Sequence, residues 1–179
     1  MVIEISDWDS IDGRKLMDIY QEGNIENVDY FYPDAVDKNE ALRKVEQNFL
    51  DFIKTDFLCG RNRYMVLECD GLWVSALRLY WVKDRFYYIE ALETHPNYRK
   101  KGYASRLLSD VLDMLKKQGS FTVCDCVHKT NAASVATHLK CGFVISSDVG
   151  YDYLQDSTDG RNYSMQFTYE EKSAAFGSH

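Results

Sequence analysis

Three consecutive cations stand directly before a glycine in the stretch HPNYRKKGYASRLL at residues 95–108. Arg99, Lys100 and Lys101 are followed by Gly102 and then by apolar residues at helical spacing. Cations are disfavoured at the amino end of a helix, because the first amide groups already carry a positive partial charge. The arrangement therefore predicts a bound anion, and a phosphate held by main-chain amides is the simplest candidate.

The glycine spacing separates this loop from two common phosphate-binding motifs. A Walker A loop needs a lysine directly after its second glycine, whereas Gly102 is followed by Tyr103, and a Rossmann fingerprint needs GxGxxG. Arg99, Gly102 and Ala104 instead form the pattern R-x-x-G-x-A, between a predicted strand and a predicted helix.

Apolar periodicity and turn residues predict the order of the elements around this loop. We expect a strand at 2–5, a helix from Asp9 or Ser10 to about Tyr20, a loop at 23–36, a helix from Asp37 to about Ile53, strands at 64–69, 72–82 and 85–94, a helix from Gly102 to about Lys117, a strand at 121–127, a helix that Asn131 caps and Gly142 ends, and strands at 143–153 and 163–169.

This order predicts an α/β fold, a single domain whose mixed sheet of six to seven strands is flanked by helices (β-α-α-β-β-β-α-β-α-β-β). The crossovers through the two later helices are expected to be parallel and right-handed. The domain is expected to span 1–172, with 173–179 as an appended tail.

The loop and the element order together resemble the GNAT superfamily of N-acetyltransferases, whose pyrophosphate loop reads Q/R-x-x-G-x-G/A. The preceding residues THPNYR at 94–99 are similar to that family's run from strand to loop. NAASVATHLKCGF at 131–143 is similar to its second motif, an asparagine that opens a helix ending in Gly-Phe. The resemblance covers nearly the whole chain and implies the acyl-CoA N-acyltransferase fold, with acetyl-CoA as co-substrate and no metal.

The resemblance also implies where acetyl-CoA binds. Its pantetheine arm would pair like an added strand with the main chain of Leu92, Glu93 and Thr94, and Asn131 would hydrogen-bond the arm. An amide near Leu92 or Glu93 would stabilise the oxyanion. The pyrophosphate would lie on the loop, with the cations at its rim, so that the expected contacts are Arg99, Lys100, Lys101, Gly102, Tyr103, Ala104 and Ser105.

Chemistry in this family is implied to be direct attack of an amine on the thioester, so none of the five cysteines needs to react. Glu90, with the strand parity of Leu92, is the expected base for the ammonium, and Glu93 is the alternative. The family often uses a tyrosine seven residues after its motif asparagine to protonate the leaving thiolate. Here His138 occupies that position, which departs from the pattern. The remaining candidate acids are water, Tyr103 and Tyr151.

The acceptor is expected to be a small primary amine, because a net charge of −7 favours a cationic substrate. Acetylation of a peptide N-terminus or lysine, and a non-catalytic acyl-CoA-binding module, remain open. Nucleic acid is not expected as a partner of so acidic a chain. Aromatic residues could hold an amine by cation–π contact, and the candidates are Tyr30, Phe31, Tyr32, Tyr151 and Tyr153.

The expected location in the cell follows from two features that the sequence does not show, a membrane-spanning run and a signal peptide. No apolar run approaches the ~20 residues of a membrane helix, and the first residues, MVIEISDWDS, have no signal-peptide pattern. We therefore expect a cytoplasmic protein without a membrane partner, and leave a homodimer open. Cys124, Cys126 and His128 would share one strand face, which is too few ligands for a zinc site, so a reduced, structural role is expected.

Overall fold

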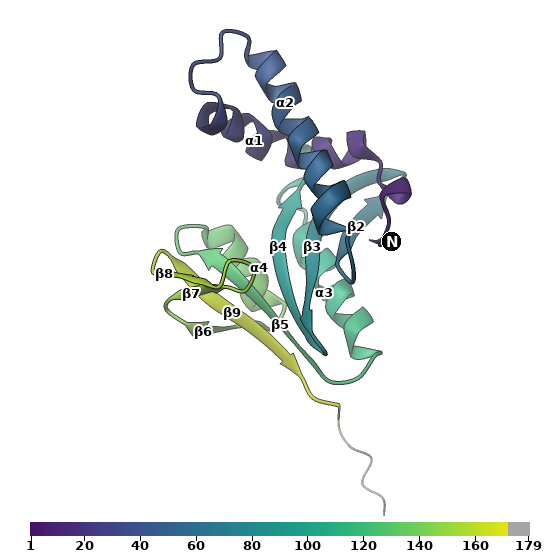
Figure 1. The fold of residues 1–179 in the computed structure, drawn as a ribbon. Helices are drawn as coiled ribbons and strands as arrows, with labels where there is room; N and C mark the ends of the chain where they lie inside the picture. The colour runs from purple at the N-terminus through teal and green to yellow at the C-terminus, as the bar shows by residue number, and fades with distance from the viewer. Residues whose placement is uncertain (172–179) are drawn as a thin grey trace, which may run out of the picture. The chain divides into compact units, whose positions relative to one another are not determined.

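The computed structural model describes residues 1–171, so the tail expected at 173–179 lies outside the described residues. Its helices are α1 Gly13–Phe31, α2 Lys38–Phe52, α3 Tyr103–Lys116 and α4 Ala132–Lys140, with short helices η1 Trp8–Ser10, η2 Ile53–Phe57 and η3 Pro96–Tyr98. Its strands are β1 Val2–Ile5, β2 Arg63–Cys69, β3 Leu72–Lys83, β4 Phe86–Thr94, β5 Phe121–His128, β6 Val144–Ser147, β7 Gly150–Asp152, β8 Ser157–Asp159 and β9 Asn162–Tyr169 (Figure 1).

Seven of the strands form one mixed sheet, in the order β1-β2-β3-β4-β5-β9-β6. β1, β2 and β3 pair antiparallel, and β9 pairs antiparallel with both β5 and β6, so β5 and β6 run in the same direction. The predicted α/β class and mixed sheet are confirmed. The strand expected at 143–153 is instead divided into β6 and β7, and β7 pairs with β8 as a separate hairpin.

The chain divides into two compact units, residues 1–81 with 89–107, and residues 82–88 with those from 108 onward. The first unit has an apolar core under α1, in which Tyr20 and Phe57 contact Tyr64 edge to face. In the second unit, Phe167 of β9 contacts the rings of Phe121 and Phe143.

The loop predicted at 23–36 is wrong for its first nine residues, because α1 continues to Phe31 (Figure 1). Its cap is Asp12, whose side chain accepts from the Lys15 amide, and not Asp9 or Ser10. Burial explains the extension, since the side of the helix that is buried at Leu16 and Tyr20 stays buried beyond Gly23, at Asn24 and Val28. The remaining loop, 32–37, leads to α2, which Asp37 caps as predicted.

The extension of α1 predicts that Gly23→Ala stabilises the protein. Gly23 is helical, and an added Cβ would meet nothing within 4 Å, so the substitution should raise the free energy of unfolding by about 0.5–1 kcal/mol. Urea unfolding measures this. Gly60→Ala is the matched control, because its Cβ also has space but its φ of 93° should make it destabilising. A destabilising Gly23→Ala would contradict a continuous helix.

Candidate active site

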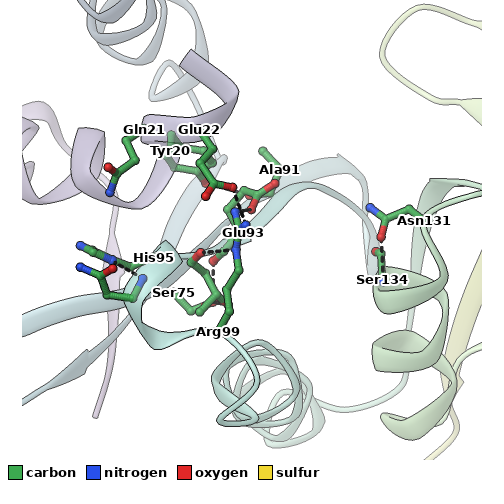
Figure 2. A network of polar contacts seen from close by, with 12 residues as sticks. Tyr20, Gln21, Glu22, Ser75, Ala91, Glu93, His95, Arg99, Asn131 and Ser134 are labelled. Atoms are coloured by element: carbon green, nitrogen blue, oxygen red, sulfur yellow. Dashed lines mark hydrogen bonds and ion pairs between the residues drawn. The ribbon is translucent and has the colours of Figure 1, made fainter. Parts of the chain in front are cut away.

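β4 adopts an unusual backbone conformation at Ala91, whose φ of 53° lies in the left-handed region. A residue with a Cβ rarely adopts this conformation unless its surroundings hold it. Tyr20 of α1 donates its hydroxyl proton to the Ala91 carbonyl at 2.7 Å. Figure 2 shows Tyr20 and Ala91 side by side. This hydrogen bond helps to fix the path of β4 immediately before the segment 92–94, where the sequence predicts cofactor pairing.

Side chains also hold the carbonyl groups of that segment. Ser75 of β3 donates its hydroxyl proton to the Glu93 carbonyl at 2.6 Å and lies 3.2 Å from the Thr94 hydroxyl. Arg99 Nε donates to the Thr94 carbonyl at 3.3 Å. Three carbonyls of the segment 91–94 are therefore oriented by side chains, so this main chain is held in a defined direction.

The basic loop contains two further left-handed residues, Lys100 with a φ of 61° and Gly102 with a φ of 80°. A Cβ on Gly102 would meet nothing within 4 Å, so there is open space beside the main chain. The first hydrogen bond of α3 runs from the Arg106 amide to the Gly102 carbonyl at 2.9 Å. The amides of Tyr103 and Ala104 lie within this first turn, where a helix offers no internal acceptor. This arrangement fits a diphosphate.

The guanidinium of Arg99 pairs with carboxylates of the protein (Figure 2). Its Nη1 pairs with the Glu22 carboxylate of α1, and its Nη2 lies 3.7 Å from the Glu93 carboxylate. The positive charge of Arg99, which the sequence analysis placed at the rim of the loop, is thus balanced by Glu22 and Glu93. Lys101 remains beside the Tyr98 ring, 5.0 Å from its centre. Lys100 and Lys101 are then the cations of the loop that could face an anion.

The two predicted base candidates have different surroundings. Glu90 forms a 2.9 Å ion pair with Arg78, and both side chains are largely buried. Glu93 is the last residue but one of β4, and its side chain is 46% exposed and lies 3.7 Å from Arg99. Its partial desolvation raises its pKa above the usual range, although Arg99 acts in the opposite direction. A raised pKa makes a carboxylate a better proton acceptor. This comparison favours Glu93.

His138 is fully buried in the second unit. Its Nδ1 lies 2.8 Å from the Ser134 carbonyl oxygen, and its Nε2 lies 2.8 Å from Asp125 Oδ2 of β5. Burial disfavours the charged ring, but Asp125 and the carbonyl more than offset it, so the pKa of His138 is raised. These contacts join α4 to β5 and support a structural role. The role of His138 as the acid remains a prediction.

The other predicted residues of the second unit are placed as follows. Asn131 caps α4, as expected, by accepting from the Ser134 amide at 3.0 Å. Its contact with the cofactor stays a prediction. Tyr151 donates its hydroxyl proton to Asp156. Burial and the nearby Cys124 raise the pKa of Tyr153 to about 12.

A cavity of about 500 Å³ lies in the first unit, beside α1, α2 and the Ala91 carbonyl. It includes the predicted Phe31 and Tyr32, whereas Tyr30 is exposed and does not line it. The sequence analysis did not predict Gly23, Asn24 and Asn27 in this wall, because 23–36 was predicted to be a loop. One signal was available, since Arg78 is the only charged residue in the apolar stretch 72–82. The full lining is Tyr20, Gly23, Asn24, Asn27, Phe31, Tyr32, Val45, Asn48, Phe49, Phe52, Arg78 and Ala91.

A membrane-spanning helix and a metal centre are two other kinds of site to consider within residues 1–171. None of the helices described there is both long enough and apolar enough to cross a membrane. Within the same residues, no three His, Cys, Asp or Glu side chains gather as metal ligands. The Cys124 thiol is buried, and this burial raises its pKa to about 11.

Comparison with known proteins agrees with this geometry. The model of the acetyltransferase (GNAT) family matches residues 18–143. The chain therefore belongs to the GNAT acetyltransferase family. A comparison with curated proteins finds no match.

Solved structures share the fold at low sequence identity. The ribosomal-protein-S18-alanine N-acetyltransferase of Escherichia coli has a TM-score of 0.62 and 18% identity, covering 100% of this chain and 99% of its own. The PaiA N-acetyltransferase of Thermoplasma acidophilum, in complex with coenzyme A, has a TM-score of 0.60 and 15% identity, covering 94% and 99%. The protein yncA of Salmonella typhimurium, with its cofactor acetyl-CoA, has a TM-score of 0.58 and 18% identity, covering 99% and 98%.

The buried His138 pair predicts a pH-dependent effect of Asp125→Asn on stability. Because the folded pKa of His138 is raised, its contribution is complete below the unfolded value of about 6.5 and is lost as the pH rises through the folded value. Asp125→Asn should lower the free energy of unfolding by about 3 kcal/mol near pH 5.5, and by less near pH 8.5. Urea unfolding at both pH values measures the change.

Asp113→Asn is the control for this experiment, since that carboxylate is exposed on α3. It should change stability little at either pH. An Asp125→Asn effect that is the same at both pH values, or larger at the higher one, would show that Asp125 does not raise the pKa of His138.

Proposed function

We propose that this protein is an N-acetyltransferase that moves an acetyl group from acetyl-CoA to a primary amine by direct attack in a ternary complex. The observation that carries the proposal is the main chain at 91–102. There, two left-handed residues precede α3 and leave amides for a diphosphate, directly after a strand segment whose carbonyls are held in place. Membership of the GNAT family supports acetyl-CoA as the acyl donor.

Main-chain groups carry most of the proposed cofactor binding. The amides of 100–105 would hold the diphosphate, with Lys100 and Lys101 adding charge, and the main chain of 92–94 would pair with the pantetheine arm. The amide of Leu92 or Glu93 would donate to the oxyanion. Asn131 is the proposed side-chain contact to the arm.

Protons must move twice in this reaction. A bond forms between the amine nitrogen and the acyl carbon while the bond from carbon to sulfur breaks, so the ammonium loses protons and the thiolate gains one. We propose that Glu93 accepts the ammonium proton directly or through water, because Glu90 is held in an ion pair by Arg78. Water could protonate the thiolate, since a thiol has a pKa of about 8.5. For His138 to protonate the thiolate instead, its ring would have to reach the cofactor sulfur from a fully buried position.

The cavity beside Ala91 is the proposed acceptor site, and its volume of about 500 Å³ suits a small molecule or one residue of a peptide. The E. coli neighbour is named for an alanine of a ribosomal protein, so a peptide N-terminus is the second candidate acceptor. We propose that residues 1–172 act as one acetyltransferase domain in the cytoplasm, as a monomer or a homodimer.

Gly102→Val should weaken coenzyme A binding. A β-branched residue does not tolerate a φ of 80°, and its side chain would enter the space beside the amides. Titration calorimetry should show a dissociation constant raised at least about 10-fold. Gly60→Val is the matched control, with a φ of 93° and equal space but a position away from the loop. Unchanged affinity in Gly102→Val, or no binding of any coenzyme A species by the wild type, would refute the proposed cofactor site.

Glu93→Gln should lower kcat/KM by about 10²–10⁴-fold, because it removes the base without changing the size of the side chain. The acid limb of the pH–rate profile should also be lost. Thiol release from acetyl-CoA measures both. Glu90→Gln should have a smaller effect and keep the limb. The reverse ranking would return the role of base to Glu90, and full activity in both variants would exclude a carboxylate base on β4.

A further inference from the structure

The charge of the acceptor cavity differs from the charge of the whole protein. Arg78 is the one charged residue among its lining residues, although the net charge of the protein is −7. The guanidinium lies 5.7 Å from the ring centre of Phe49 and 5.2 Å from that of Phe52. Its side chain is 15% exposed. A cation between apolar walls is screened less than a cation in water, so it discriminates more strongly between ligand charges.

Arg78 keeps binding capacity beyond its ion pair. Its Nη2 donates to Glu90, which does not itself line the cavity. A guanidinium has five N–H donors in a planar fork, so a second oxygen ligand can bind without displacing Glu90. A second ammonium group, such as the far end of a polyamine, would instead meet a like charge at this wall.

The cavity wall also contains the uncharged side-chain amides of Asn24 and Asn48. Asn24 is buried, and the hydrogen bond that the structure gives its amide is to Met17 Sδ at 3.4 Å, a weak acceptor. Asn48 Nδ2 lies 3.5 Å from the Tyr32 hydroxyl, at the limit of a hydrogen bond. Amides held this weakly can exchange their partners for stronger ligand oxygens.

The rest of the cavity is apolar. Phe31, Val45, Phe49 and Phe52 line it, which suits a hydrocarbon or aromatic side chain. Ala91, two residues before the proposed base Glu93, lies in the same wall. An acceptor amine close to Ala91 would therefore stand next to the segment proposed to hold the thioester.

We propose, on the basis of the acetyltransferase function above, that the acceptor is a primary amine that also carries a carboxylate and an apolar side chain, the chemistry of a hydrophobic amino acid. Arg78 binds the carboxylate with help from the cavity asparagines, and the aromatic wall holds the side chain. This replaces the small cationic amine inferred from net charge with a zwitterion whose acidic group selects it.

Binding, measured apart from turnover, tests the proposal. Calorimetry with saturating coenzyme A compares L-phenylalanine with three probes: its amide, phenethylamine and spermidine. We expect phenylalanine to bind at least about 10-fold more tightly than each, a typical effect of losing one charge-assisted contact. Tighter binding of spermidine would overturn the proposal. Tighter binding of the amide would overturn it in favour of a peptide-like acceptor.

The double substitution Arg78→Met with Glu90→Gln removes the guanidinium without leaving a buried unpaired carboxylate. It should abolish the preference for phenylalanine over phenethylamine while coenzyme A still binds. Arg63→Met with Glu4→Gln, which removes a 3.1 Å ion pair between β2 and β1, should keep the preference. A preference that persists without Arg78 would overturn the assignment. If the double variant does not fold, the wild-type probe series alone decides.

Thiol release with the same compounds separates the two proposals. Preferential binding of phenylalanine without release of coenzyme A thiol would contradict the acetyltransferase function and leave the carboxylate site standing. Turnover of phenethylamine or spermidine in preference to phenylalanine would support the function and overturn the acceptor class.

Discussion

Left-handed backbone at Ala91, Lys100 and Gly102 is the constraint on which the candidate site depends. Two of these three residues carry a Cβ, and each costs of order 1 kcal/mol or more. The conformations persist because neighbouring groups fix the chain around them. Tyr20 holds the carbonyl of Ala91, while Ser75 and Arg99 hold the carbonyls that follow. The site is therefore built mainly from main-chain groups, and the side chains that matter most for its shape are those that position this main chain.

Helix α1 links the two halves of the proposed reaction. Tyr20 and Glu22 contact β4 and the basic loop, where the cofactor is proposed to bind. Asn24, Asn27 and Phe31 line the cavity proposed for the acceptor. Tyr20 belongs to both sets, because it lines the cavity and bonds the Ala91 carbonyl. A shift of α1 would consequently move the main chain at Ala91, next to the segment proposed to hold the thioester, so the two proposed sites share this structural element.

The sequence predicted the features that depend on local signals. The basic loop, the hairpin strands and the Asn131 cap follow from residue type and short spacing. The end of α1 could not be predicted in this way, because Gly23 and Asn24 favour a turn locally and only burial against the rest of the unit keeps them helical. The pairing of Arg99 with Glu22 could not be predicted either, since the two residues are 77 positions apart. Ion pairs between residues far apart in the sequence determine which charged side chains are already paired within the protein and which can contact a ligand.

The two arginine pairs around Ala91 show how similar residues acquire different chemistry. Arg78 and Glu90 form a 2.9 Å ion pair in which both side chains are largely buried, and removing either partner would leave a costly unpaired charge. Arg99 is shared by Glu22 and Glu93, and its contact with Glu93 is the longer one at 3.7 Å. Glu93 is partly desolvated and has this more distant partner, and its pKa is raised. Glu93, whose cation is more distant, is therefore the carboxylate proposed as the base. Arg78 of the closer pair lies in the cavity wall, where it is proposed to bind an acidic ligand group.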